Sequence, residues 1–137
     1  MSPLKTIALS PPLSPIIDSL TNQDLFQYYL EIPAQRLADT SPSYIDLFGN
    51  YIPAMAQNEP ALMEALLGLA ALQMGHSVKG LDLSMSVRAI NHYQKALRIH
   101  YESLRNPQAL TTDVPLATSL ILSHFEVSLC GSSVIPF

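Results

Sequence analysis

The chain has 137 residues, a length that suits one domain and allows about two-thirds of the unfolded surface to be buried. Charged residues make up 13% of it, against about 25% in typical soluble domains, and the formal net charge is −4. These values exclude a general electrostatic attraction to nucleic acid or acidic membranes, and the single cysteine, Cys130, excludes an internal disulfide framework and a multi-cysteine zinc site.

The first 20 residues combine prolines with serines and show no helical pattern. Pro3, Pro11, Pro12 and Pro15 interrupt the apolar residues that follow Lys5, so this stretch reads as neither a secretory signal nor a membrane span. We predict a disordered leader over residues 1–20 and a cytosolic or nuclear protein.

Two helices with aromatic faces are predicted next. Residues 21–38 form the first, with a cap at Thr21 or Asn22 and a break at Pro33. Residues 41–57 form the second, with Ser41 as its cap and a bend caused by Gly49 and Pro53.

The stretch from Asn58 to Gly75 organises the rest of the chain. Between Ala61 and Met74 only Glu64 and Gln73 are polar, and they fall on roughly opposite sides of a helix. A helix that is apolar all round is either buried or in a membrane, and this one is too short to span a bilayer. We therefore predict a central buried helix that Pro60 starts and Gly75 ends, with small residues such as Gly68 allowing a neighbour to approach closely.

The longest amphipathic pattern covers about residues 84–105. Its apolar stripe repeats at steps of three and four residues, which predicts the face that packs on the core: Val87, Ile90, Tyr93, Leu97, Tyr101 and Leu104. The polar stripe carries four of the seven basic residues: Arg88, Lys95, Arg98 and Arg105. Because Glu102 interrupts this row and no aromatic residue interleaves it, a solvated face is favoured over a nucleic-acid site.

A last helix is predicted over about residues 114–129, capped by Thr112 or Asp113 and closed by Gly131. No segment alternates with a period of two, and the loops between successive helices are short. The predicted fold is therefore all-α, with about five helices packed as antiparallel hairpins in the manner of a helical array.

Residues that could support chemistry do not form a recognised motif. His100 and Glu102 have the spacing of the zinc deaminases but no partner C-x-x-C, and His92 and His100 are separated by about 12 Å of helix rise, too far to share a metal. The five glycines are dispersed, so no phosphate-binding loop exists. We predict no enzyme activity, no cofactor and no metal.

Four stretches, in order and spacing, resemble the N-terminal part of the fungal-specific transcription factor domain, the regulatory region that follows the zinc cluster in many fungal regulators. They are LFQYYLEIPAQRLA from Leu25, NEPALMEALLGLAALQMGH from Asn58, AINHYQKALRIHYESL from Ala89 and DVPLATSLILSHFEV from Asp113. The resemblance implies an all-helical nuclear domain that regulates RNA polymerase II transcription through protein contacts. The zinc cluster is absent here, so no direct DNA binding is expected.

We expect the chain to be divided into a leader over residues 1–20, a truncated regulatory-type domain over 21–130 and a tail over 131–137. The scarcity of charged residues predicts a protein partner or self-association. The residues expected to face that partner lie on the first and last helices: Tyr28, Tyr29, Leu120 and Phe125.

Two alternatives remain at this point. The chain could be a small non-metal helical enzyme or ligand-binding protein with a pocket lined by Tyr28, Tyr51, Tyr93, His92 and His100. It could also be a nonfunctional truncated paralogue, which would fold poorly.

Overall fold

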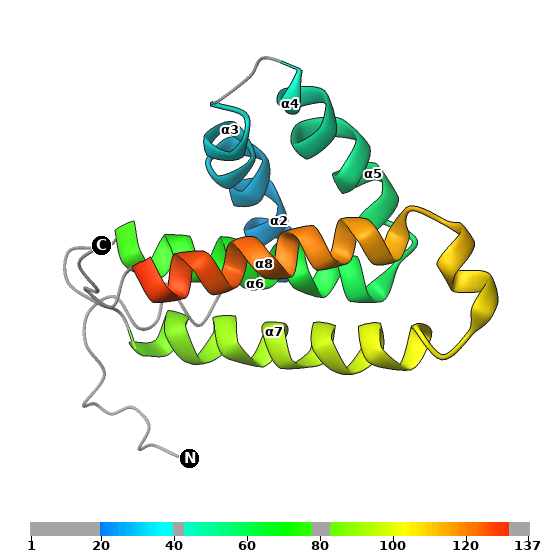
Figure 1. Cartoon of the computed structure of the whole chain (residues 1–137). Helices are drawn as coiled ribbons and strands as arrows, with labels where there is room; N and C mark the ends of the chain where they lie inside the picture. The colour runs from blue at the N-terminus through cyan, green and yellow to red at the C-terminus, as the bar shows by residue number, and fades with distance from the viewer. Residues whose placement is uncertain (1–19, 40–42, 78–82, 132–137) are drawn as a thin grey trace.

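The computed structural model describes residues 20–39, 43–77 and 83–131, and these ranges contain helices and turns only, which confirms the all-α prediction (Figure 1). The elements in chain order are α2 (Asn22–Glu31), α3 (Pro33–Leu37), α4 (Tyr44–Asp46), the π-helix η2 (Leu47–Tyr51), α5 (Ile52–Ala56), α6 (Pro60–Ser77), α7 (Leu83–Ser103), the 3-10 helix η3 (Pro107–Thr111) and α8 (Val114–Gly131). The predicted leader, the Ser41 cap and the predicted tail lie outside the described residues, apart from Leu20 and Gly131 at their edges.

α6 is the centre of the fold. It packs most extensively against α7, next against α8, and also against α2, α3 and α5. Successive long helices α6, α7 and α8 run antiparallel, and the pairs α2–α3 and α4–α5 lie on the other side of α6 from α7 (Figure 1). Leu62, Leu66 and Leu69 are 0% exposed, so the predicted burial of this helix is confirmed. Each buried leucine contributes about 1.5–3 kcal/mol to folding.

The first two helices form where they were predicted, and local chemistry explains their breaks. Thr21 accepts from the Asp24 N–H at 3.0 Å while Asp24 accepts from the Thr21 N–H at 2.9 Å, a reciprocal cap that starts α2. Pro33 separates α2 from α3, because a proline inside a helix removes one N–H and displaces the preceding turn.

The bend predicted from Gly49 and Pro53 takes the form of a π-helical turn. The Ile52 N–H donates to the Leu47 carbonyl, five residues back. In that register the Phe48 carbonyl would accept next from residue 53, but Pro53 has no N–H. The Tyr29 hydroxyl donates to the Phe48 carbonyl instead, at 2.9 Å, and so ties α2 to this turn.

Two sequence predictions are wrong in detail. Gly75 does not end the central helix, which continues to Ser77. The predicted apolar stripe of α7 is not its most buried face: Val87 is 60% and Tyr101 63% exposed, whereas the positions that are buried are Met85, Ala89, His92, Ala96 and His100.

Candidate interaction surface

The close approach of α6 and α7 decides which side of α7 is buried. A Cβ atom on Gly68 would lie 3.3 Å from the His92 Cβ, 3.4 Å from the Ala89 carbonyl oxygen and 3.4 Å from the Tyr93 nitrogen. Only small side chains and the slender stems of histidines fit between helices this close. The long apolar side chains of α7 are therefore displaced to the flank that lies toward α8, where Ile90, Tyr93 and Leu97 are half-buried.

α8 presents an apolar face to solvent on its outer side. Across its eighteen residues the only charged side chain is Glu126. Its inner side packs on α6 through buried Ile121 and Phe125, while Leu116 and Val127 on the outer side are 73% and 68% exposed. An apolar helix that is covered on one side only leaves an unusually apolar surface in water.

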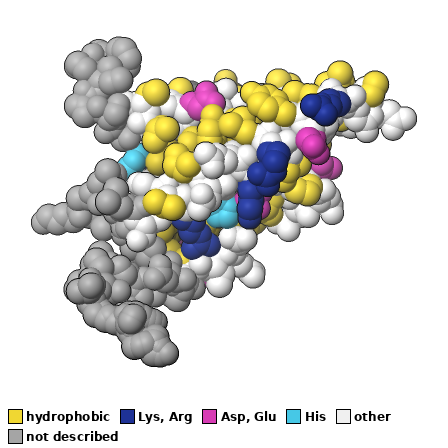
Figure 2. Space-filling model, turned by 90° about the horizontal axis from the view of Figure 1, so that it is seen from below, with side chains coloured by type: hydrophobic (Ala, Val, Ile, Leu, Met, Phe, Trp, Pro, Cys, Tyr) yellow, Lys and Arg dark blue, Asp and Glu magenta, His cyan; other side chains and the backbone are white. Residues whose placement is uncertain are grey.

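We call these two features together the α7–α8 surface. It consists of Ile90, Tyr93, Leu97 and Tyr101 from α7 with Leu116 and Val127 from α8. The exposed polar side chains of α8 that contact α7, Ser119 and Glu126, lie between the two sets. Figure 2, which views the molecule from the α7 side, shows hydrophobic side chains spread over this face beside a row of basic ones.

Polar contacts along the junction hold the two helices in register. The Tyr93 ring stacks on Phe125 with centroids 4.5 Å apart, and its hydroxyl donates to Glu126 at 2.5 Å. Burial first, and the Glu126 carboxylate second, raise the pKa of Tyr93 to about 12. Near the other end, His100 Nε2 lies 3.1 Å from the Ser119 hydroxyl, and burial lowers the pKa of His100. The surface is therefore held in one shape before any partner arrives.

The four residues predicted to face a partner divide into two pairs. Tyr29 and Phe125 are 0% and 1% exposed, so both side chains are part of the core that α6 builds. Tyr28 and Leu120 are half-buried at the edge of the core. Leu120 also lines a surface cavity of about 420 Å³ with residues of α3, α4 and η2.

Three of the residues predicted to line a pocket for an enzyme or ligand-binding protein make separate contacts between helices. The Tyr51 hydroxyl donates to Asp113 at 2.8 Å, linking η2 to the start of α8. His92 Nδ1 lies 2.6 Å from Glu64 Oε1 between α7 and α6, whereas His100 pairs with α8. None of these side chains lines the cavities described in this section.

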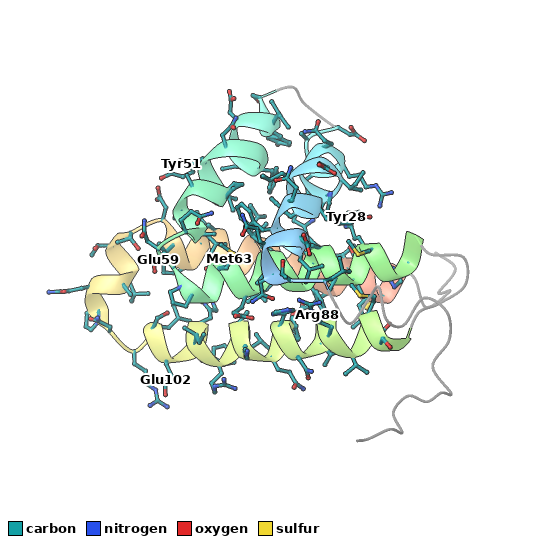
Figure 3. All side chains as sticks on the ribbon, turned by 180° about the vertical axis from the view of Figure 1, so that it is seen from behind. Tyr28, Tyr51, Glu59, Met63, Arg88 and Glu102 are labelled. Atoms are coloured by element: carbon teal, nitrogen blue, oxygen red, sulfur yellow. The ribbon has the colours of Figure 1, made fainter. Side chains whose placement is uncertain are left out.

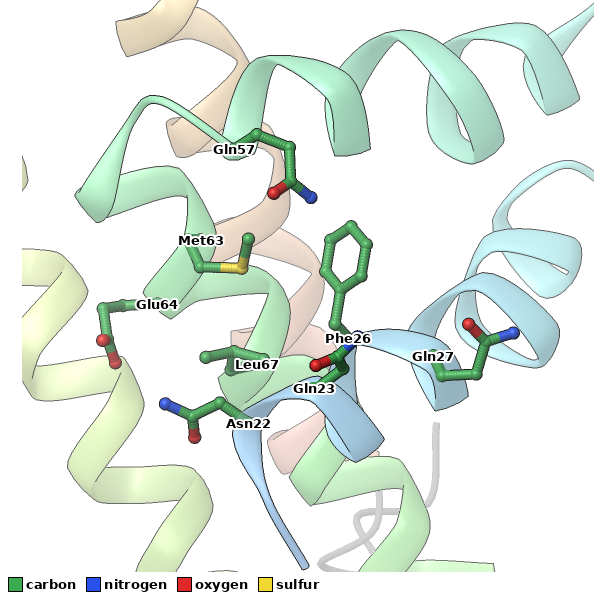
Figure 4. A pocket seen from close by; sticks show the side chains of 8 residues that line it. All are labelled: Asn22, Gln23, Phe26, Gln27, Gln57, Met63, Glu64 and Leu67. Atoms are coloured by element: carbon green, nitrogen blue, oxygen red, sulfur yellow. The ribbon is translucent and has the colours of Figure 1, made fainter.

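A different cavity, of about 480 Å³, lies between α2 and the first turns of α6 (Figure 4). Phe26, Met63 and Leu67 provide its apolar part, and carboxamides surround them: Asn22, Gln23, Gln27 and Gln57. Carboxamides form hydrogen bonds but do not titrate near neutral pH, and the lining carboxylate, Glu64, already pairs with His92. This cavity can bind a neutral polar group, and Glu64 is the one titratable side chain among its lining residues.

Within the described ranges, no group of three or more His, Cys, Asp or Glu side chains is placed to hold a metal ion. No helix in these ranges combines the length and apolar character that crossing a bilayer would need.

A family model described as the fungal-specific transcription factor domain matches residues 24–134. Two curated relatives are both called sterol uptake control protein 2. The one from Candida albicans is 28% identical over 124 residues, covering 83% of this chain and 17% of the relative. The one from Saccharomyces cerevisiae is 29% identical over 104 residues, covering 76% of this chain and 11% of the relative. The chain thus spans less than a fifth of either relative, and no solved structure matches.

Proposed function

The chain belongs to the fungal-specific transcription factor domain family, and on that premise we propose that it regulates RNA polymerase II transcription through protein–protein contacts. The match over residues 24–134, which covers nearly all the described helices, carries this proposal. From the relatives' names, we further propose that the genes it regulates include those for sterol uptake.

The α7–α8 surface supports the proposal that the chain acts through protein–protein contacts. Stable protein interfaces have an apolar centre with aromatic anchors, and Tyr93 and Tyr101 are the aromatic members of this surface. Tyr28 and Leu120 remain proposed contacts at the edge of the core. We propose that the chain is nuclear and that it neither catalyses a reaction nor binds DNA by itself. The outer face of α7 supports the last point, because Glu102 lies among its few basic residues.

Transcript measurements test the proposal. In fungal cells, deletion and overexpression of the gene should change the levels of sterol-uptake transcripts in opposite directions when sterol supply is altered. A nuclear fluorescent fusion of the full chain should accompany this change. Unchanged transcripts in both strains would contradict the regulatory role.

A variant that tests only the surface completes the experiment. Tyr101→Asp together with Val127→Asp places two charges on the α7–α8 surface at exposed positions, where they should not disturb the core. Gln35→Asp together with Ala54→Asp, at exposed positions of α3 and α5, adds the same charge and is the matched control. The Tyr101 and Val127 double variant should show the same change in sterol-uptake transcripts as the deletion strain, and the control should show wild-type transcript levels.

A further inference from the structure

One border of the α7–α8 surface is basic. Arg98 and Arg105 are exposed on the outer side of α7, next to the flank that carries Tyr101, and Lys95 is exposed farther round the helix, on the side that carries Arg88. Glu102 is the only acidic side chain on α7. Figure 3, seen from the opposite side to Figure 1, shows Glu102 pointing away from the bundle (Figure 3). This row is locally positive on a chain whose net charge is −4.

Arg88 differs from the other three basic residues of α7. Its guanidinium donates to the Leu20 carbonyl at 2.7 Å and to the Asn22 side chain at 3.2 Å, so it anchors the chain just before α2. Figure 3 shows it on the side of α7 that lies toward α2. The charge available to a partner therefore comes from Lys95, Arg98 and Arg105.

The opposite border carries a single charge. The exposed residues of α8 are Leu116, Ser119, Ser123, Glu126, Val127, Leu129 and Cys130, and the Glu126 carboxylate accepts from Tyr93. The surface thus has one basic border and one border whose only charged side chain is Glu126. A ligand that complements it is apolar along one stripe and acidic along one adjoining edge.

We propose that the α7–α8 surface binds an amphipathic acidic helix of another protein. The apolar residues of such a helix, at spacings of three and four, contact Tyr93, Leu97, Tyr101 and Leu116, and its carboxylates lie over Arg98 and Arg105. This inference rests on the proposed function, because it specifies the partner of the same surface.

A second copy of the chain fits this surface less well. In a two-fold dimer whose axis runs across α7 and α8, the basic row of each copy faces the basic row of the other. On each row three basic side chains outnumber one acidic side chain, and like charges at a short distance repel. An acidic helix meets the same row with attraction.

Two synthetic helical peptides test the proposal against the full chain. Both are about 18 residues long, enough for a helix to form, and carry the same leucines at helical spacing. One has glutamates along the edge of the leucine stripe and the other has lysines. Fluorescence anisotropy at low salt should show the acidic peptide binding about tenfold more tightly, since a few exposed charge pairs together supply about that factor. The preference should shrink as salt is raised.

Charge reversal is the decisive variant. Lys95→Glu, Arg98→Glu and Arg105→Glu together should make the lysine peptide the tighter ligand. Arg36→Glu, an exposed basic position on α3, should leave the original preference intact. Circular dichroism checks that both variants keep the helical content of the wild type.

Several results would overturn the inference. Equal affinity for the two peptides would do so, as would an unchanged preference in the charge-reversed variant. A dimer seen by sedimentation that Tyr101→Asp abolishes would assign the surface to a second copy instead. If the peptide preference is found while transcripts do not respond to deletion, the surface inference stands and the regulatory role fails.

Discussion

Tyr29 connects α2 to the π-helical turn through a single buried hydroxyl. It donates to the Phe48 carbonyl at 2.9 Å, and burial raises the pKa of this hydroxyl well above its ordinary value of 10.0. Because Pro53 offers no N–H, loss of the hydroxyl leaves the Phe48 carbonyl without this donor.

We expect Tyr29→Phe to lower the free energy of unfolding by about 1–2 kcal/mol, since the carbonyl remains buried. Urea denaturation measures the change. Tyr101→Phe is the matched control at a position that is 63% exposed, where the change should be close to zero. Equal losses in the two variants would mean that the Tyr29 hydroxyl has no structural role.

The hydroxyl of Thr118 is buried but, unlike that of Tyr29, has no hydrogen-bond partner among the described residues. Thr118→Val keeps the shape and removes the unsatisfied group, so it should raise the free energy of unfolding by up to about 1 kcal/mol. Thr118→Ser keeps the hydroxyl and loses a methyl group, so it should be less stable than wild type. If Thr118→Val lowers the free energy of unfolding as much as Thr118→Ser does, the unsatisfied hydroxyl does not cost stability.

Between elements, the contact of α6 with α7 depends on Gly68. A side chain there would meet the α7 backbone at Ala89 and Tyr93 and the Cβ of His92. Backbone atoms cannot move aside as the end of a flexible side chain can, so α7 would have to shift away from α6 as a whole.

Gly68→Leu should therefore lower the free energy of unfolding by about 1–3 kcal/mol, the usual cost of overpacking. Thermal unfolding followed by circular dichroism measures the loss. Ala54→Leu adds comparable bulk at an exposed position of α5 and should change stability little. If the two substitutions have the same effect, the close approach of α6 and α7 does not limit packing.

The same contact explains what could be predicted from the sequence at this scale. The period of residues 84–105 identified α7, and the apolar run identified α6 as the buried centre. Periodicity shows that a helix has an apolar stripe, but it does not show which neighbour that stripe meets. Gly68 brought α7 so close to α6 that small residues and histidines took the buried face, and the long side chains became surface.

The candidate site was only partly predictable for a related reason. Tyr29 and Phe125 were expected on the outside because they are aromatic and lie on the first and last helices. Both helices turn those residues toward α6. The signal for the α7–α8 surface was nevertheless present, since α8 has one charged residue in eighteen and yet can be covered by α6 on one side only.

For the whole molecule, two histidines make stability depend on pH: His100 is buried and His124 is half-buried. Burial lowers the pKa of both side chains below their ordinary value of 6.5. The unfolded chain takes up protons below about pH 6.5, while the folded state resists protonation until a lower pH. The stability that both neutral imidazoles contribute is therefore fully present above about pH 6.5 and is lost as the pH falls below it.

The free energy of unfolding, measured with urea at pH 7.5 and at pH 5.5, should be lower at pH 5.5. The double variant His100→Gln with His124→Gln should show a smaller difference between the two pH values than wild type. A difference as large as that of wild type would assign the pH dependence to other groups.

The central claim is that this regulator acts through its α7–α8 surface, and cells that depend on the chain provide the most direct measurement. Sterol-uptake transcripts would be quantified in strains carrying wild type, Leu116→Asp with Val127→Asp, or the control Gln35→Asp with Ala54→Asp, all at matched protein levels. Leu116 and Val127 are among the most exposed apolar side chains of the described residues, and Gln35 and Ala54 are exposed on α3 and α5. We predict that the Leu116 and Val127 variant loses regulation and that the control, with the same added charge, retains it. Full regulation in the Leu116 and Val127 variant would contradict the claim.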